Sequence, residues 1–589
     1  MSDPTDEQRP PVLHVHPVQA KVQISPDQSV LQALQEHGIF LESPCDGQGI
    51  CGQCTIRVHP AQAVPPTPHA HISEQDSEEG IRLACQCFPD QDVDIYLPPT
   101  YRMQAQSRVQ EDPILMGSAL DFGHIDPAVR LVHARDRVWL ERDEDMEAAL
   151  LGPDWKDGGS ATGLAVDLGT TTIVLSLICL QTGRELASSG RLNPQVSYGH
   201  DVLTRIQKGS TPEGLDLLAS SVHEVIKDMI DEVCTQAGRS PQEILDIVIG
   251  GNTTMLQLCA RVDPAPLGHM PFEVGLASGC SYPASTFGFE LNSLARVYVP
   301  PITHAFVGSD ISAGLMAVPH FFASKGNMLF LDVGTNGEMG VQHNQTRMVT
   351  STAAGPAFEG AGLSSGMRAT QGAIQAVSFD GRDLQLEVIG NVPPVGLCGS
   401  GLLDLLHTLL ELEIIDSSGR LRSCDQVSGL SPELRARRIV RQGKAAFDLG
   451  NGVGLTQEDI RQVQLAKGAV RTGIDLLLDA VGLTPAELDQ IVISGGFGNV
   501  LRPANLEAVG MLPPHTAPKV VFAGNTSQTG CIRLLLSRSL RRRLEEDMKQ
   551  VKHVALAQDT AFMDLFVNNL EFPQPEQVMD NQLAACKEC

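Results

Sequence analysis

Short alternating runs of apolar and polar residues near the N-terminus predict a small sheet with one helix. Residues 12–25 have the patchy alternation of a β-hairpin, and residues 25–38 have the pattern of a helix with a capping residue near its start and a glycine at its end. Residues 54–60 and 92–98 read as further strands. The first 98 residues therefore form one small α+β unit in this interpretation.

The pattern weakens between residues 99 and 160. A polar stretch that begins with prolines follows the last N-terminal strand and has the composition of a linker. Residues 125–159 predict one short strand and an acidic helix, and the glycines and serine that follow predict a loop. We therefore predict a linker and a small middle region before the next large domain.

The large remainder of the chain contains an internal repeat. Residues 165–177 (AVDLGTTTIVLSL) and 330–342 (FLDVGTNGEMGVQ) are both apolar strands that end in Asp, followed by Gly-Thr and a second strand. A turn and a third strand follow each copy, with the turns at 181–184 and 343–346. Matched elements in the same order indicate duplication of a structural unit.

Two further elements repeat in the same order. Residues 245–255 and 488–500 each contain a Val/Ile-rich strand that ends in paired glycines. Residues 306–314 and 522–530 share the pattern F-x-G, five residues, then G, and a helical stretch follows each. Strands that alternate with helices predict α/β structure, so the repeat predicts two related α/β lobes.

Composition and charge narrow the class of protein. At 589 residues the chain is too long for one core, and we expect three or four domains. The formal net charge of −27 disfavours nucleic acid and anionic membrane surfaces as partners. The chain shows no signal peptide and no apolar run long enough to span a bilayer, and its 14 cysteines are scattered, so we expect a cytoplasmic protein.

Four cysteines have the spacing of an iron–sulfur site. They are Cys45, Cys51, Cys54 and Cys85, separated by five, two and thirty residues. A [2Fe–2S] cluster takes four thiolates, and three close together with a distant fourth is the plan of plant-type ferredoxins. With a first gap of five, the set resembles the vertebrate and bacterial [2Fe–2S] ferredoxins, which implies a β-grasp fold and electron transfer.

Two other uses of these cysteines are weaker. Structural zinc usually takes two paired knuckles, but only Cys51 and Cys54 form one here. Disulfides do not suit the reducing compartment that we expect. Cys87 is a weak rival to Cys85 and reads as a buried thiol. Cys586 and Cys589 form a lone C-x2-C pair that we interpret as a frayed terminus.

The repeated D-x-G-T segments carry phosphate chemistry. A strand–turn–strand with this sequence directs several backbone N–H groups into one concavity, where phosphate oxygens find donors. The Asp at the strand end can hold Mg²⁺ through water, because Mg²⁺ keeps much of its hydration shell. The late glycine pair allows close approach of a base and ribose. Two facing copies would bind a polyphosphate between the lobes.

The arrangement resembles the ATPase superfamily of actin, sugar kinases and heat-shock chaperones, which implies a duplicated ribonuclease H-like fold. The resemblance implies that Asp167 and Asp332 act on Mg²⁺ and water. It also implies three nucleotide-binding loops. They are a first phosphate loop of Gly169, Thr170, Thr171 and Thr172, a second of Gly334, Thr335, Asn336 and Gly337, and an adenosine loop of Gly495, Gly496, Phe497 and Gly498. Glu338 and Glu359 are further candidates for orienting water.

A [2Fe–2S] ferredoxin domain ahead of this ATPase resembles the reductive activators of corrinoid proteins. The resemblance covers residues 1–98 and 161–570 and includes the stretches GPAFEGAGLSSGM and VGLCGSGLLDLL. It implies ATP-dependent one-electron reduction of a corrinoid protein from Co(II) to Co(I), with a [2Fe–2S] cluster, ATP and Mg²⁺. A reductase or ferredoxin would be the electron donor, and a homodimer stays open. Gly399-Ser400-Gly401 opens an apolar helix and lies either near the nucleotide or at a close helix contact.

We thus expect a multidomain protein of α/β and α+β class. The expected domains are a ferredoxin-like domain (1–98), a linker and small middle region (99–160), ATPase lobe 1 (161–325), ATPase lobe 2 (326–570) and a C-terminal tail (571–589). Two alternatives remain. One is an ATP-driven activator of another low-potential metalloenzyme. The other is a non-catalytic docking or chaperone module that senses redox state and nucleotide.

Overall fold

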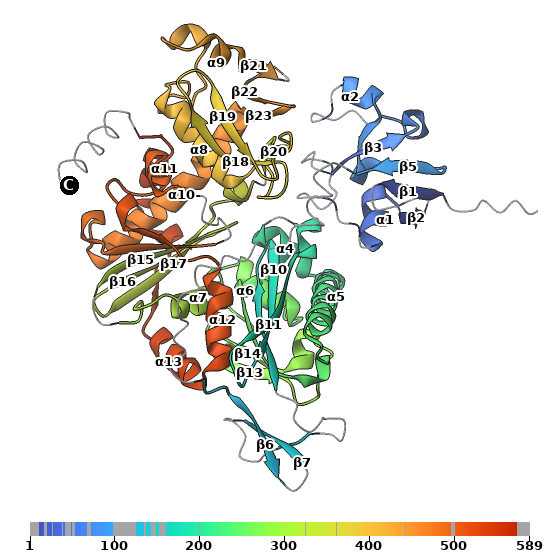
Figure 1. Ribbon diagram of the computed structural model, residues 1–589, viewed down its shortest axis with the longest axis vertical. Helices are drawn as coiled ribbons and strands as arrows, with labels where there is room; N and C mark the ends of the chain where they lie inside the picture. The colour runs from blue at the N-terminus through green and yellow to red at the C-terminus, as the bar shows by residue number, and fades with distance from the viewer. Residues whose placement is uncertain are drawn as a thin grey trace, which may run out of the picture.

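The N-terminal domain is a five-stranded sheet with one covering helix (Figure 1). The computed structural model describes residues 11–16, 20–25, 28–37, 39, 41, 49, 54–66, 72, 74–97, 125–134, 137–142, 149–151, 161–199, 201–323, 326–360, 362–441, 443–495 and 501–573. Among the described residues up to 97, the strand order is β2-β1-β5-β3-β4. The strands are β1 (Val12–His16), β2 (Ala20–Gln23), β3 (Thr55–His59), β4 (Ile81–Leu83) and β5 (Val93–Tyr96).

The pairing in this domain matches the β-grasp prediction. Strands β1 and β2 form the antiparallel hairpin, and β5 runs parallel to β1. Helix α1 (Val30–Glu36) starts after Ser29, whose hydroxyl accepts a hydrogen bond from the backbone N–H of Gln32 at 3.3 Å. A short helix α2 (Glu74–Glu78) precedes β4. The buried core includes Leu13, Val15 and Ile95, all fully covered.

The middle region contains a small sheet of three strands, where the sequence predicted one short strand; residues 143–148, which carry the acidic stretch of the predicted helix, lie outside the described residues. Strands β6 (Val129–Ala134), β7 (Arg137–Arg142) and β8 (Ala149–Leu150) form an antiparallel sheet. Alternating apolar positions here bury Val129, Val138 and Leu140 against the following domain.

Two six-stranded sheets form the large remainder, in the part of the chain that the structure describes. The first sheet has the order β11-β10-β9-β12-β14-β13, and the second has β25-β24-β15-β16-β17-β26. The strands of the first are β9 (Thr162–Leu168), β10 (Thr172–Cys179), β11 (Glu185–Leu192), β12 (Ile244–Gly251), β13 (Cys280–Pro283) and β14 (Arg296–Val299). Those of the second are β15 (Asn327–Val333), β16 (Gly337–His343), β17 (Thr346–Thr352), β24 (Gln490–Ser494), β25 (Val520–Phe522) and β26 (Lys552–His553).

The two sheets confirm the predicted duplication. In each, the first three strands are antiparallel neighbours, and a later strand joins parallel to the first. We call the two halves lobe 1 and lobe 2. The strand register shifts the predicted match between the two glycine pairs by one residue. Gly250 lies beside Asp167, and the residue beside Asp332 is Ser494. Gly250 therefore corresponds in position to Ser494.

The repeated F-x-G-x5-G segments form two helices that cross between the lobes. They are α7 (Ser309–Ala317) and α12 (Thr526–Leu536), and α12 lies beside the strands of lobe 1 in Figure 1. A Cβ on Gly530 would lie 1.9 Å from the carbonyl oxygen of Ala313, so this position requires glycine. Helix α12 packs on β9 and β12 of lobe 1, α7 packs on β12 as well, and the two helices contact each other closely. A Cβ on Gly314 would likewise lie 2.8 Å from the Thr526 hydroxyl, so the contact between the helices explains the second glycine of the motif.

Other helices cover the sheets. In lobe 1 they are α4 (Val202–Gly209), α5 (Pro212–Ala237) and α6 (Thr253–Cys259). Lobe 2 carries α8 (Gly399–Glu411), α9 (Pro432–Ala436), α10 (Gln457–Val481), α11 (Pro503–Ala508), α13 (Arg538–Met548) and α14 (Phe562–Asn568). None of the helices within the described ranges is long and apolar enough to cross a bilayer.

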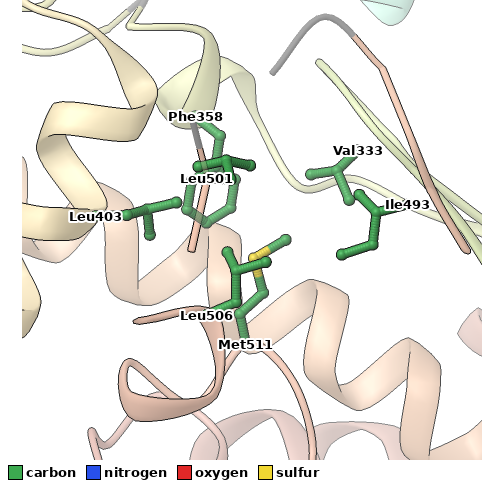
Figure 2. Close-up of a pocket in the computed structure, with 7 residues that line it drawn as sticks. All are labelled: Val333, Phe358, Leu403, Ile493, Leu501, Leu506 and Met511. Atoms are coloured by element: carbon green, nitrogen blue, oxygen red, sulfur yellow. The ribbon is translucent and has the colours of Figure 1, made fainter. Parts of the chain in front are cut away.

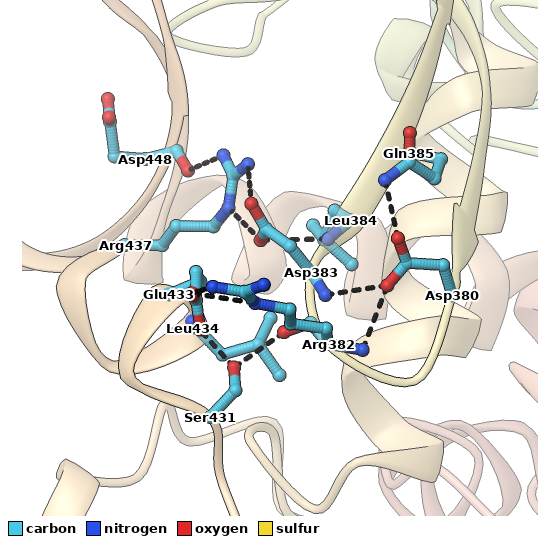
Figure 3. Close-up of polar contacts among 10 residues, drawn as sticks. All are labelled: Asp380, Arg382, Asp383, Leu384, Gln385, Ser431, Glu433, Leu434, Arg437 and Asp448. Atoms are coloured by element: carbon cyan, nitrogen blue, oxygen red, sulfur yellow. Dashed lines mark hydrogen bonds and ion pairs between the residues drawn. The ribbon is translucent and has the colours of Figure 1, made fainter.

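Lobe 2 also carries two three-stranded sheets beyond its central sheet. The strands are β18 (Ala373–Phe379), β19 (Leu384–Val388), β20 (Gly396–Leu397), β21 (Arg438–Arg441), β22 (Lys444–Gly450) and β23 (Val453–Thr456). Figure 3 shows polar contacts that join the β18–β19 turn to α9 and β21. Arg437 donates to Asp383 at 2.6 and 2.8 Å, and Arg382 donates from Nε to Glu433 at 2.8 Å.

Candidate nucleotide and iron–sulfur sites

The first phosphate loop is a tight turn between β9 and β10. The backbone N–H of Gly169 donates to the carbonyl of Thr172 at 3.0 Å, which closes the turn. Asn193 supports it from behind, because its Nδ2 donates to the Gly169 carbonyl at 2.9 Å and its backbone N–H donates to the Thr171 carbonyl at 2.9 Å. The turn is thus held in shape by buried contacts, and its hydroxyls stay partly exposed.

The second phosphate loop joins β15 to β16 in the same way. The Gly334 N–H donates to the Asn336 carbonyl at 2.9 Å. The Thr335 hydroxyl donates to Glu359 Oε1 at 3.1 Å, and the Asn336 side chain donates to Glu338 Oε1 at 3.2 Å. Glu338 and Glu359, named as candidates from the sequence, therefore lie at this loop.

The two loops meet across the lobes. Thr171 Oγ1 and Thr335 Oγ1 lie 3.2 Å apart, although 164 positions separate them in the chain. This contact brings the strand-end Asp167 and Asp332 to the same place. A polyphosphate bound here would find backbone and hydroxyl donors from both lobes.

Several buried acidic side chains gather at this junction. Burial and the neighbouring Asp167 raise the pKa of Asp332 to about 7. Burial, Asp332 and Asp167 raise the pKa of Asp310 to about 8. Burial also raises the pKa values of Asp167 and Glu338. Like charges that share a site disfavour ionisation, and a bound cation would relieve this repulsion.

Asp310 is a site residue that the sequence analysis missed. It lies in the first turn of α7, within the repeated F-x-G segment, where the second copy has Thr526. Its signal in the sequence is that Asp310 is the one carboxylate that distinguishes the two copies of the repeat. The sequence also gave no sign that α12 would reach the first loop.

Helix α12 supplies polar partners to Asp167. Asn525 Nδ2 donates to one carboxylate oxygen at 2.8 Å, and the Ser527 hydroxyl donates to the other at 2.7 Å. A Cβ on Gly250 would lie 3.0 Å from the Ser527 hydroxyl, so the glycine leaves room for this contact. Asp332 instead accepts from Ser494, on the adjacent strand of its own lobe, at 3.3 Å.

The predicted adenosine loop begins at the end of β24. Gly495 has φ of +116°, a conformation that favours glycine, and its N–H donates to the Gly524 carbonyl at 3.1 Å. Gly496, Phe497 and Gly498 lie outside the described residues. Their roles stay predictions.

An apolar cavity lies behind the site in lobe 2 (Figure 2). Three of the residues that line it are immediate neighbours of site residues in the chain. These three are Val333, Phe358 and Ile493, next to Asp332, Glu359 and Ser494. The remaining walls are Leu403, Leu501, Leu506 and Met511.

The segment Gly399-Ser400-Gly401 serves close packing. A Cβ on Gly401 would lie 2.2 Å from the carbonyl oxygen of Ile374 on β18. The Ser400 hydroxyl donates to the Gln375 carbonyl at 2.8 Å. Of the two readings of this segment, the structure supports the helix contact.

The ferredoxin domain brings two of the predicted cluster ligands together. Cys54 and Cys85 are both buried, and a hydrogen bond from the Cys85 side chain is the largest cause that lowers the pKa of Cys54 to about 7. Burial raises the pKa of Cys87 to about 12, which favours the neutral thiol. Cys45 and Cys51 lie outside the described residues, as do Cys586 and Cys589. A thiol of lowered pKa at Cys54, hydrogen-bonded to the thiol of Cys85, fits thiolate ligation of a cluster.

Comparison with known proteins gives a consistent order of domains. Residues 13–90 match the profile of the 2Fe-2S iron-sulfur cluster binding domain, and residues 162–319 match the RACo middle region. Residues 326–582 match the C-terminal domain of RACo, the ASKHA domain. Fold and site together thus define an ASKHA-type nucleotide-binding protein fused to a [2Fe–2S] ferredoxin domain.

Relatives along nearly the whole chain narrow this class. The chain is 29% identical to the corrinoid activation enzyme RamQ of Eubacterium limosum, over 94% of this chain and 98% of that protein. A solved structure, the reductive activator for corrinoid, iron-sulfur protein, matches with a TM-score of 0.68 and 28% identity over 96% of this chain and 98% of its own. The [Co(II) methylated amine-specific corrinoid protein] reductase of Methanosarcina barkeri is 26% identical over 52% of this chain and 58% of that protein. The chain is a homologue of the reductive activators of corrinoid proteins.

Proposed function

We propose that this chain uses ATP to drive one-electron reduction of a corrinoid protein from Co(II) to Co(I), the form that serves methyl transfer. The contact between Thr171 and Thr335 carries the proposal, because it joins two phosphate loops into one site in a chain that also has a [2Fe–2S]-binding domain. The names of the relatives point to corrinoid proteins as the target.

The cluster would be held by Cys54 and Cys85 together with the sequence-predicted ligands Cys45 and Cys51. When bound, it supplies a carrier for single electrons. An external reductase or ferredoxin would reload it. We place this chemistry in the cytoplasm, a reducing compartment in which thiolates stay available to a cluster.

ATP would bind with Mg²⁺ between the lobes. Asp167 and Asp332 would hold the hydrated ion through water, since within the described residues no three His, Cys, Asp or Glu side chains are grouped tightly enough to bind a metal directly. The backbone N–H groups and threonine hydroxyls of both loops would bind the phosphates. The predicted roles of Gly169 to Thr172 and of Gly334 to Gly337 follow from this placement.

Asp310 would accept the proton of the attacking water. Its pKa of about 8 lies near physiological pH, where a general base combines useful basicity with a sufficient ionised fraction. Asp332 and Glu359 lie nearby and would orient the water. Positioning and charge neutralisation carry most of phosphoryl transfer, so no covalent intermediate is needed.

ATP would act through the relative position of the lobes. Reduction to Co(I) is uphill for an ordinary [2Fe–2S] donor, and 59 mV of mismatch changes a one-electron equilibrium tenfold. A nucleotide changes this only if it binds one state of the complex better than another. The crossed helices α7 and α12 link the two loops to both sheets, so closure on ATP would reach the docked corrinoid protein.

A spectroscopic mixing experiment tests the proposal. Reduced protein with MgATP is added to candidate corrinoid proteins, and the Co(I) absorption band is followed while iron is counted and the cluster is monitored by EPR. We expect the band to grow with one cluster oxidised per Co(I) formed. If no corrinoid protein is reduced but another metalloenzyme takes the electron, the alternative activator is correct. ATP binding with no electron transfer would favour the docking module.

A further inference from the structure

The first described residues of the middle region are bonded to the corner between α12 and α13. Ile125 and Asp126 are the next residues that the structure describes after residue 97, so in the chain they follow the ferredoxin domain. The Asp126 backbone N–H donates to the Leu536 carbonyl at 2.9 Å, and the Arg538 N–H donates to the Asp126 carbonyl at 2.9 Å. The two bonds form a parallel bridge around Ser537, whose backbone is extended.

Side chains strengthen this attachment. The Asp126 carboxylate accepts from Arg538 Nε at 2.7 Å and also from Arg130. Only 15% of the Asp126 side chain is exposed, so water screens the pair less than it screens a surface ion pair. The Cδ1 atoms of Ile125 and Leu536 lie 3.1 and 3.3 Å from the position of a Cβ on Gly183, in the β10–β11 turn. We call the contacts of residues 125–126 with residues 536–538 the α12 anchor.

The other end of the same helix lies at the nucleotide site. Asn525 and Ser527 donate to the Asp167 carboxylate at 2.8 and 2.7 Å. Between this end and the anchor, α12 runs for about 16 Å, since a helix rises 1.5 Å per residue. Figure 1 shows the segment that leads into β6 meeting the lower end of α12. Because close-packed helices transmit displacement, a shift of α12 at Asp167 would reach the anchor.

The middle sheet has a separate attachment to lobe 1. Arg142 on β7 donates to the Leu245 carbonyl at 2.8 Å and also to the Leu294 carbonyl. Val129 and Leu140 are buried in the core that this sheet shares with lobe 1. The α12 anchor therefore adds a second attachment, to the helix that contacts the nucleotide site. Attachments to two different elements make the middle region sensitive to their relative position.

We propose that Asp126 is a positioning residue for the electron transfer, and that its bonds to Leu536 and Arg538 couple nucleotide binding to the segment that follows the ferredoxin domain. This inference rests on the proposed function and names the connection through which ATP would act. A nucleotide that changes the contacts of Asp167 moves α12, and residues 125–126 follow the far end of the helix. One electron is still lost by the reduced cluster and gained by Co(II), and Asp126 exchanges neither a proton nor an electron.

Hydrogen exchange of the full chain tests the connection directly. Mass spectrometry compares backbone exchange at residues 125–130 with and without Mg²⁺ and a non-hydrolysable ATP analogue. We expect the analogue to slow exchange there about 3-fold or more, because fixing one end of α12 reduces opening of the hydrogen bonds at its other end. Asp126→Ala should lose this response. Unchanged exchange at these residues in wild type that binds the analogue would overturn the proposal.

Electron transfer separates this role from a structural one. ATP hydrolysis and the ratio of Co(I) formed with and without MgATP are measured for each variant with a corrinoid protein that wild type reduces. We expect Asp126→Ala and Arg538→Gln to keep ATP hydrolysis within about 2-fold but to lower the ratio about 3- to 30-fold. Arg538→Lys keeps the charge and should retain most of the ratio. The control Arg142→Gln removes the other attachment of the sheet and should keep the wild-type ratio.

Two further results would contradict the coupling. A wild-type ratio in both Asp126→Ala and Arg538→Gln would make the α12 anchor a purely structural attachment. An equal loss in Arg142→Gln would assign the effect to docking of the middle sheet. If Asp126→Ala does not fold by circular dichroism, Arg538→Gln and the exchange of wild type decide. A wild-type chain that forms no Co(I) with MgATP, while the analogue still slows exchange at residues 125–130, would contradict the proposed function and support the connection.

Discussion

The two strand-end carboxylates occupy matched positions in the two lobes but are held in different ways. Asp167 accepts from Asn525 and Ser527, which lie on a helix that follows a strand of lobe 2. Asp332 accepts from Ser494 on the adjacent strand of its own lobe. The two lobes thus share the carboxylate but differ in where its hydrogen-bond donors come from. Lobe 1's half of the site depends on lobe 2, and this dependence makes the site sensitive to the position of the lobes.

The largest expected effect comes from replacing Asp310, whose counterpart in the second copy of the repeat is Thr526. Asp310→Asn removes the proposed proton acceptor, so kcat for ATP hydrolysis should fall about 10²- to 10⁴-fold with ATP affinity retained. Phosphate release and calorimetric binding measure the two quantities. Thr526→Val is the matched control and should lower kcat far less. Comparable rates in Asp310→Asn and wild type would remove Asp310 from the chemistry.

A second comparison concerns the ion pairs that anchor each lobe. Arg541 on α13 is buried and pairs with Asp246 of lobe 1 at 2.7 Å. Arg541→Met leaves that carboxylate unpaired and should lower the free energy of unfolding by about 3–5 kcal/mol. Urea denaturation of full-length protein measures this. The matched substitution Arg382→Gln removes an exposed ion pair in lobe 2 and should barely change the urea midpoint of unfolding (Figure 3). Equal shifts would contradict the assigned difference in burial.

The hydroxyls on the two carboxylates provide a finer comparison. Ser527→Ala removes a 2.7 Å contact between lobes, and Ser494→Ala removes a 3.3 Å contact within one. We expect Ser527→Ala to cost about 1–3 kcal/mol in unfolding free energy and Ser494→Ala less. Denaturant midpoints of the two variants give the order. The reverse order would mean that the contact between lobes is not the stronger support.

The smallest effect is a pH dependence of the nucleotide-free protein. The folded-state pKa values of Asp332 and Asp310, about 7 and about 8, lie above the usual value of an aspartate. The folded protein therefore binds more protons than the unfolded chain between about pH 4 and pH 8, and its stability falls as pH rises through that window. The fall should exceed about 1 kcal/mol between pH 5 and pH 8, because one pKa unit is worth about 1.4 kcal/mol.

Variants identify the groups behind this dependence. Asp332→Asn and Asp310→Asn should each flatten the profile of unfolding free energy against pH, since neither amide titrates. A profile as steep as that of wild type in both variants would assign the dependence to other groups.

Local sequence was enough to predict the repeated elements, because strand pattern and turn chemistry are local properties. It placed Asp167 and Asp332 at strand ends and Thr171 and Thr335 in the loops. It could not supply Asn525 or Ser527 as neighbours of the site, because their contacts with Asp167 arise where α12 crosses to lobe 1 and join residues far apart in the chain. The prediction of a single strand in the middle region was wrong for a local reason. Its short, charged strands carry too few apolar positions to separate a period of 2 from one of 3.6.

The central claim is that ATP binding between the lobes makes the electron transfer possible. The direct test is a stopped-flow measurement in which the reduced, full-length chain is mixed with a Co(II) corrinoid protein, with and without MgATP, while the Co(I) band is recorded. The account predicts a Co(I) yield that rises strongly with ATP. An equal yield with and without ATP would contradict it.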